Sequence, residues 1–160
     1  MKQNYLAVLM VVCIVLGIFL SCKTTSMSDK NTFFIMVYDY ESNEVNDVEI
    51  YLNEKKCGQT DIYGRFILAL TKETSGVLVF KKDRYETISV KLEDTGRDFL
   101  YVKIGSSYYY AQMSEKLLDE KKHKEALEHI EKALAIENRK DYEFLKNVIV
   151  GESEKWKKVK

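Results

Sequence analysis

The stretch GQTDIYGRF, from Gly58 to Phe66, is the most informative part of the sequence, because residues typical of a tight turn are followed directly by the start of an apolar strand. Asp61 carries a short carboxylate that can accept hydrogen bonds from the backbone amides ahead of it. Gly64 can adopt the positive φ angle that a tight hairpin requires. We therefore interpret Asp61 as the cap of a hairpin turn. The alternative role, a calcium ligand, needs about 6–8 oxygen ligands around the ion.

Segments with a period of two residues lie on both sides of this turn. Val48, Ile50 and Leu52 alternate with Glu49 and Tyr51, which is typical of a half-buried strand. Further strand-like runs, with no helical segment between them, occupy residues 32–39, 65–70, 76–80, 87–92 and 98–104. Short strands in this succession predict a small antiparallel β-sandwich over residues 32–104.

The turn, with residues 48–52 before it and Tyr85 after it, resembles the carboxypeptidase regulatory-like domain. The central motif of that family has the form Gly-x-Thr-Asp-x-x-Gly-x-Phe, and the residues that match it are Gly58, Thr60, Asp61, Gly64 and Phe66. Arg84 stands before the tyrosine, where the family usually has glycine. The resemblance implies a transthyretin-like β-sandwich in which the motif residues are structural. It also implies a non-catalytic accessory module of exported proteins, associated with folding support, carbohydrate-like binding surfaces or protein contacts.

After Gly105 the apolar period changes to about 3.6 residues, which predicts helices. Either Ser106 or Ser107 can cap the first of them. We expect a second helix over about 123–136 and a third segment, with Leu145, Val148, Ile149 and Trp156 as its apolar positions, from Asp141. The predicted fold class is therefore α+β: a sandwich, then a helical hairpin over 107–140, then a capping helix and basic tail over 141–160.

The hairpin spacing resembles one tetratricopeptide repeat, in which small residues let two helices approach closely. The positions that match its packing residues are Tyr110, Ser114, Ala126 and Ala133. The alternative is a generic amphipathic hairpin. One hairpin cannot bury both its faces, so we expect it to pack on the sandwich, on the capping segment or on another chain.

The N-terminal residues predict a secretory signal over residues 1–21. An uncharged apolar run from Tyr5 to Leu20 follows Lys2. As a helix it would span about 24 Å, which is short of the roughly 30 Å hydrocarbon core of a bilayer. Ser21 and Cys22 then resemble a lipobox, which implies cleavage between them and lipid attachment to Cys22. Ordinary signal cleavage and an uncleaved anchor are the alternatives; residues 22–31 would form a polar tether.

Composition and charge argue against several classes of function. Lysine plus arginine equals aspartate plus glutamate at 25 each, so the sequence lacks the basic excess of a nucleic-acid-binding protein. His123 and His129 are six residues apart on one predicted helix, so they point to different faces and cannot share a metal ion. Cys57 is interpreted as a small, half-buried hydrophobic residue in preference to a reactive thiol. We expect no cofactor, no metal site and no catalytic activity.

These features predict a membrane-anchored lipoprotein of the bacterial cell envelope that acts as a protein-interaction or assembly module. The hairpin would supply the contact with a partner protein or with a second copy. The alternative is a glycan-binding surface lipoprotein that uses exposed tyrosines such as Tyr40, Tyr51 and Tyr63. Tyrosines gathered on one face of the sandwich would favour the glycan alternative, whereas an uncovered apolar patch on the hairpin would favour the protein partner.

Overall fold

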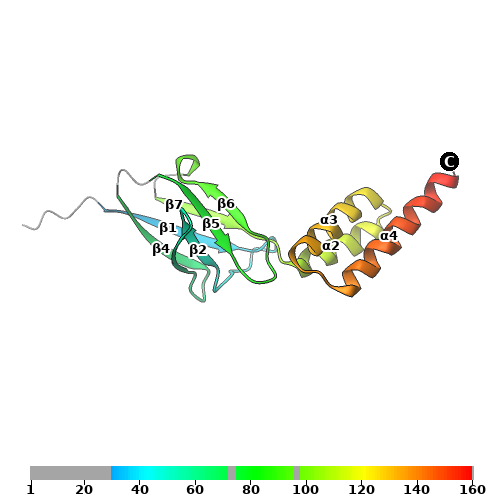
Figure 1. The fold of residues 1–160 in the computed structure, drawn as a ribbon, viewed down its shortest axis with the longest axis horizontal. Coiled ribbons are helices and arrows are strands. Elements are labelled where there is room, and N and C mark those ends of the chain that lie inside the picture. The colour runs from blue at the N-terminus through cyan, green and yellow to red at the C-terminus, as the bar shows by residue number, and fades with distance from the viewer. Residues whose placement is uncertain (1–29, 72–74, 96–97, 160) are drawn as a thin grey trace, which may run out of the picture. The chain divides into compact units, whose positions relative to one another are not determined.

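The computed structural model describes residues 30–71, 75–95 and 98–159, with side chains placed over 32–70, 75–95 and 98–153. Within these ranges, seven strands and one short 3₁₀ helix precede three α-helices (Figure 1). The α+β class predicted from the sequence is confirmed. The elements are β1 (Lys30–Tyr38), β2 (Glu49–Leu52), β3 (Lys55–Gln59), β4 (Arg65–Thr71), β5 (Val77–Lys81), β6 (Ile88–Lys91), η1 (Leu92–Asp94), β7 (Phe99–Lys103), α2 (Ser107–Asp119), α3 (His123–Ile136) and α4 (Lys140–Val159).

The strands form two sheets, one in the order β4-β1-β7 and the other in the order β3-β2-β5-β6. In the second sheet β2 is antiparallel to both β3 and β5, and β5 is antiparallel to β6. In the first sheet β1 runs parallel to β7, with Phe34 opposite Phe99. The expectation of an all-antiparallel sandwich therefore does not extend to this pair. A period of two residues places side chains on faces but does not encode strand direction, and the long chain between β1 and β7 permits a parallel pairing.

Alternate residues of both sheets enclose one hydrophobic core. Phe33, Ile35 and Val37 of β1 are buried in it, together with Leu78 and Phe80 of β5. Successive side chains of a strand point to opposite faces, so these strands necessarily present their other residues outward. The burial pattern confirms the sandwich expected for residues 32–104.

The three helices share a second buried cluster. Ser106 is the N-cap of α2, because its side chain accepts a hydrogen bond of 3.0 Å from the backbone N–H of Tyr109. Tyr142 and Ile149 of α4 are buried in the same cluster as Ile130 of α3, so α4 covers part of the hairpin. Among the described residues, no helix combines the length and apolar character that crossing a membrane requires.

Candidate functional site

The turn predicted from the sequence is built by Asp61. Its Oδ1 accepts hydrogen bonds from the backbone N–H groups of Tyr63 and Arg65, each 2.9 Å long. Gly64 has a φ of 67°, and a Cβ built on it would lie 2.5 Å from the carbonyl oxygen of Val37. The bond from the Arg65 amide is the main reason why the pKa of Asp61 is lowered. The carboxylate is thus occupied by its own turn, as the turn-cap interpretation expects.

The other motif residues also serve the local structure. Thr60 is buried, and its Oγ1 donates to the carbonyl of Val45 at 2.8 Å while it accepts from the N–H of Val48 at 2.9 Å. The ring of Phe66 lies against Gly58, where an added Cβ would come within 2.5 Å of the Phe66 ring. These contacts leave the motif little side-chain chemistry for a ligand.

The tight hairpin expected at this turn needs a correction. The turn is local and tight, with the N–H of Asp61 donating to the carbonyl of Arg65 at 2.9 Å. However, β3 and β4 belong to different sheets, so the turn carries the chain from one layer of the sandwich to the other. Turn chemistry specifies the local backbone, whereas the sheet that each flanking strand joins depends on its other neighbours.

The residues assigned to repeat packing are all buried in the helical cluster. Ala126 and Ala133 of α3 have no exposed surface, and Tyr110 of α2 is 4% exposed. Ser114 lies opposite α3, where its Oγ donates to the carbonyl of Ala126 at 2.7 Å. Two small side chains therefore permit a direct contact between side chain and backbone at the helix interface.

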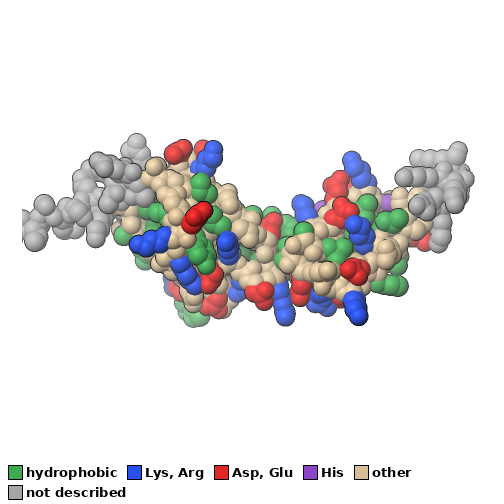
Figure 2. Space-filling model, viewed as in Figure 1, with side chains coloured by type: hydrophobic (Ala, Val, Ile, Leu, Met, Phe, Trp, Pro, Cys, Tyr) green, Lys and Arg blue, Asp and Glu red, His purple; other side chains and the backbone are tan. Residues whose placement is uncertain are grey.

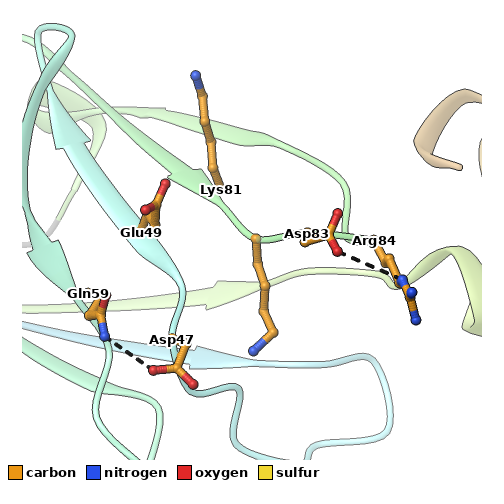
Figure 3. Close-up of a pocket in the computed structure, with 7 residues that line it drawn as sticks. Asp47, Glu49, Gln59, Lys81, Asp83 and Arg84 are labelled. Atoms are coloured by element: carbon orange, nitrogen blue, oxygen red, sulfur yellow. Dashed lines mark hydrogen bonds and ion pairs between the residues drawn. The ribbon is translucent and has the colours of Figure 1, made fainter.

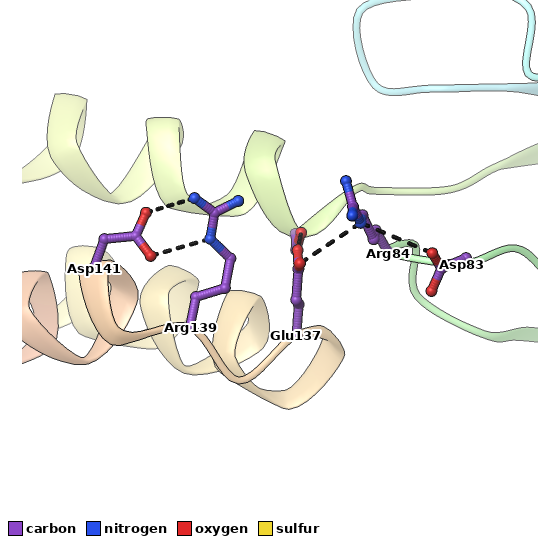
Figure 4. Close-up of polar contacts among 6 residues, drawn as sticks. Asp83, Arg84, Glu137, Arg139 and Asp141 are labelled. Atoms are coloured by element: carbon purple, nitrogen blue, oxygen red, sulfur yellow. Dashed lines mark hydrogen bonds and ion pairs between the residues drawn. The ribbon is translucent and has the colours of Figure 1, made fainter.

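Polar contacts link the loop between β5 and β6 to the end of α3 (Figure 4). Arg84 adopts a φ of 62°, the left-handed region that glycine favours, and its Nε lies 3.6 Å from a carboxylate oxygen of Glu137. Ser107 donates to the same carboxylate at 2.8 Å. The backbone N–H of Gly105 donates to Glu86 at 2.6 Å. Sequence reasoning marked Arg84 as a departure from the family pattern but did not foresee its contact with Glu137, which joins residues far apart in the chain.

The three tyrosines of the glycan alternative have separate surroundings. Tyr40 stacks on Tyr109 with ring centroids 5.1 Å apart, and Tyr63 lies under the guanidinium group of Arg65. Tyr51 is half-buried and donates a hydrogen bond of 2.8 Å to Glu49. Among the described residues, no ring contact joins Tyr40, Tyr51 and Tyr63 to one another.

A hollow of about 840 Å³ opens on the surface beside β2 and β5 (Figure 3). It is lined by acidic and basic residues together: Asp47, Glu49, Gln59, Lys81, Lys82, Asp83 and Arg84. Several of these groups already bind one another or a close neighbour. Gln59 donates to Asp47 at 3.2 Å, Glu49 is paired with Lys56, and Arg84 lies 3.8 Å from Asp83. Mixed and mutually compensated charges give the hollow no preference for a ligand of either sign.

The outer side of α4 carries an apolar stripe that we call the α4 stripe, made of Phe144, Val148 and Gly151. Phe144 is 70% exposed and Val148 is 36% exposed, and an added Cβ at Gly151 would meet open space. The three residues recur at i, i+4 and i+7, so they lie on one face of the helix. Figure 2 shows hydrophobic side chains at the surface over the helices. Val148 and Ile149 are both apolar positions of the predicted third segment, but only Ile149 is buried, and Phe144 is not among the positions predicted for it.

The predictions for the cysteines, the histidines and the signal segment differ in their outcome. Cys57 is an exposed free thiol on β3, so the half-buried position expected for it is wrong, because β3 is an edge strand of its sheet. His129 hydrogen-bonds through Nδ1 to the carbonyl of Glu125 at 2.9 Å. Within the described part of the chain, no group of three or more histidine, cysteine, aspartate or glutamate residues could hold a metal ion. Ser21, Cys22 and the signal segment lie outside the described residues.

Comparison of the sequence with models of known protein families and with characterised proteins gave no match.

Proposed function

We propose that this chain is a non-catalytic, lipid-anchored protein of the bacterial cell envelope that binds a partner protein through the α4 stripe. The observation that carries the proposal is the exposure of Phe144 and Val148 on one face of a helix whose opposite face is already buried. Burying a side chain of this kind contributes about 1.5–3 kcal/mol relative to leaving it exposed. A helix from another protein could bury both side chains at once.

The form of the α4 stripe fits a helical partner. Phe144 projects a large ring, whereas Gly151, two turns further on, leaves room for a side chain of the partner. Close helix packing uses this alternation of large and small residues. Helical hairpins that resemble tetratricopeptide repeats normally stack with further helices, and α4 is where such stacking would continue.

The support for the lipid anchor in this proposal comes from the sequence. The apolar run that ends at Ser21 and Cys22 resembles the signal and lipobox of bacterial lipoproteins. Acyl chains on Cys22 would bury methylene groups at about 0.8 kcal/mol each, which keeps a multiply acylated chain in the bilayer. The partner would then be another component of the same membrane surface.

The test is crosslinking in cells, followed by detergent purification of the tagged protein. The matched variants are Val148→Asp in the α4 stripe and Val150→Asp on another face of the same helix; the two valines are 36% and 38% exposed. We expect one protein to be recovered in stoichiometric amount with the wild type and with Val150→Asp, and to be lost with Val148→Asp. A third variant, Cys22→Ala, should lose both membrane fractionation and the partner.

Two results would contradict the proposal. Recovery of the wild-type protein without any partner removes the adaptor function and leaves the glycan-binding alternative to be examined. Unchanged membrane fractionation of Cys22→Ala shows that the cysteine is not the anchor.

A further inference from the structure

The outer face of the sheet β4-β1-β7 is apolar and exposed. Phe33, Ile35 and Val37 point into the core, which leaves the alternate residues of β1 outside. We use the name aromatic sheet face for four exposed side chains on this side: Phe34 (39% exposed), Ile67 (59%), Phe99 (55%) and Tyr101 (66%).

Strand pairing gathers these side chains. The parallel register sets Phe34 opposite Phe99, and their rings stack with centroids 5.2 Å apart. The N–H of Val37 donates to the carbonyl of Gly64 at 2.8 Å, one residue before β4 begins. Because β1 ends at Tyr38, β4 must run back along β1. This direction brings Ile67 towards Phe34. The patch therefore draws side chains from all three strands of this sheet.

The outer face of the other sheet has a different character. Glu49 of β2 is paired there with Lys56, and the ammonium group of Lys81 lies over the ring of Tyr51 at 5.1 Å. Ser89 and Lys91 are the exposed residues of β6. Charged and polar groups thus surround the apolar residues of this face, Val77 (37% exposed) and the partly exposed Val79. The larger exposed aromatic side chains of the two sheets lie on the opposite side of the sandwich.

The end of the aromatic sheet face that holds Phe34 is close in sequence to the proposed anchor at Cys22. Seven residues lie between Cys22 and Lys30, where β1 begins, and the eight residue-to-residue steps from Cys22 to Lys30 can span at most about 26–29 Å. Phe34 is four residues into β1, about 13 Å further on, and Phe99 beside it begins β7. The exposed cations Arg65 and Lys103 lie towards the other end of the sheet, at the start of β4 and at the end of β7.

We propose that the aromatic sheet face lies on the surface of a lipid bilayer, with Phe34, Phe99 and Ile67 at the boundary between headgroups and acyl chains. The inference rests on the proposed lipid anchor at Cys22 and adds a second, reversible membrane contact to it. Aromatic side chains such as Tyr101 favour this interfacial region, because a ring can be buried while its hydroxyl stays in water. A short covalent link to the bilayer raises the local concentration of lipid at this face, so a modest apolar patch is enough.

The experiment uses the mature lipidated protein in vesicles of phosphatidylethanolamine and phosphatidylglycerol that carry bromine on their acyl chains. An environment-sensitive fluorophore is placed by Ala69→Cys, at an exposed position on the outer face of β4, in a Cys57→Ser background. The matched control is Ser89→Cys, on the outer face of the other sheet. A third protein combines Ala69→Cys with Phe99→Asp. Flotation of the protein with the vesicles measures anchoring, whereas bromine quenching measures contact between the labelled face and the acyl chains.

We expect bromine quenching and a blue shift at position 69, with no change at position 89. Phe99→Asp should abolish the quenching at 69 while the protein still floats with the vesicles. Floating protein with an unquenched label at 69 would overturn the membrane contact and leave the anchor intact. Energy transfer between labels at 69 of two copies, without quenching, would assign the face to a second copy instead. Failure to float would overturn both the proposed anchor and this inference.

Discussion

Gly64 lies in the turn where the chain crosses from one sheet to the other, and this turn depends on its backbone conformation. Its φ of 67° closes the turn that Asp61 caps, and its hydrogen atom occupies the place where a Cβ would lie 2.5 Å from the carbonyl oxygen of Val37. Since Val37 is fully buried in β1, its backbone cannot move away without disturbing the core. Both the conformation and the space at this position therefore require glycine.

Replacing Gly64 by alanine should lower the free energy of unfolding by at least about 1–2 kcal/mol, the cost of the left-handed conformation alone. The matched variant is Gly151→Ala in α4, where the new methyl group meets open space. That change should raise helix stability by about 0.5–1 kcal/mol. Urea unfolding followed by circular dichroism measures both. An unchanged midpoint for Gly64→Ala would show that the turn relaxes.

At the scale of elements, the helical part depends on how closely α2 and α3 approach. Ala126 and Ser114 meet at their interface, where the Ser114 hydroxyl bonds to the Ala126 carbonyl at 2.7 Å. The side chain of Ala126 has no exposed surface, whereas Ala135, on the same helix, is exposed. Position on the helix, not the identity of the residue, thus decides which alanine tolerates a larger side chain.

We expect Ala126→Leu to destabilise the helices by about 1–3 kcal/mol, because the added atoms overpack a closed interface. Ala135→Leu adds the same atoms at a solvent-facing position and should change stability by less than about 0.5 kcal/mol. Thermal unfolding monitored at 222 nm, the helical signal, compares the two variants. Equal effects would mean that α2 and α3 are not packed through Ala126.

At the scale of the whole molecule, aromatic and polar contacts connect the sandwich residues to the first helix. Tyr40, which follows β1, stacks on Tyr109 and meets Tyr110 edge-on with ring centroids 6.2 Å apart. Burial, and hydrogen bonding with Tyr40 and Glu86, raise the pKa of the Tyr110 hydroxyl. The ring of Tyr40 therefore packs against other rings of the protein. It is not a free tyrosine of the kind that the glycan-binding alternative requires.

Tyr40→Ala should weaken this connection by about 0.5–1.5 kcal/mol per lost aromatic pair. We expect the wild type to unfold in one calorimetric transition. Because the sandwich and the helices have separate hydrophobic clusters, Tyr40→Ala should broaden or split that transition. Tyr108→Ala is the control, since Tyr108 is 62% exposed on α2. A split transition with both variants, or with neither, would contradict the role assigned to Tyr40.

Features that are encoded locally could be predicted from the sequence. Hydrophobic period placed α3 at residues 123–136, where the structure has it, and located six of the strands. Turn chemistry identified Asp61 and Gly64, and small residues at helical spacing identified Ala126 and Ala133. Sequence reasoning missed β3, because KKCGQ carries no alternation of apolar and polar residues and lies at the edge of its sheet.

How these elements combine depends on tertiary contacts that the sequence pattern does not reveal. The tertiary structure set β1 parallel to β7, sent the Asp61 turn from one sheet to the other, exposed Cys57 and stacked Tyr40 on Tyr109. It also placed Val148 on the exposed face of α4 and Ile149 on the buried face. The side chains of Phe34, Ile67, Phe99 and Tyr101 came together on one outer face of the sandwich. The physical reason is that periodicity distinguishes the two faces of a strand or helix, whereas which face is buried depends on neighbours distant in sequence.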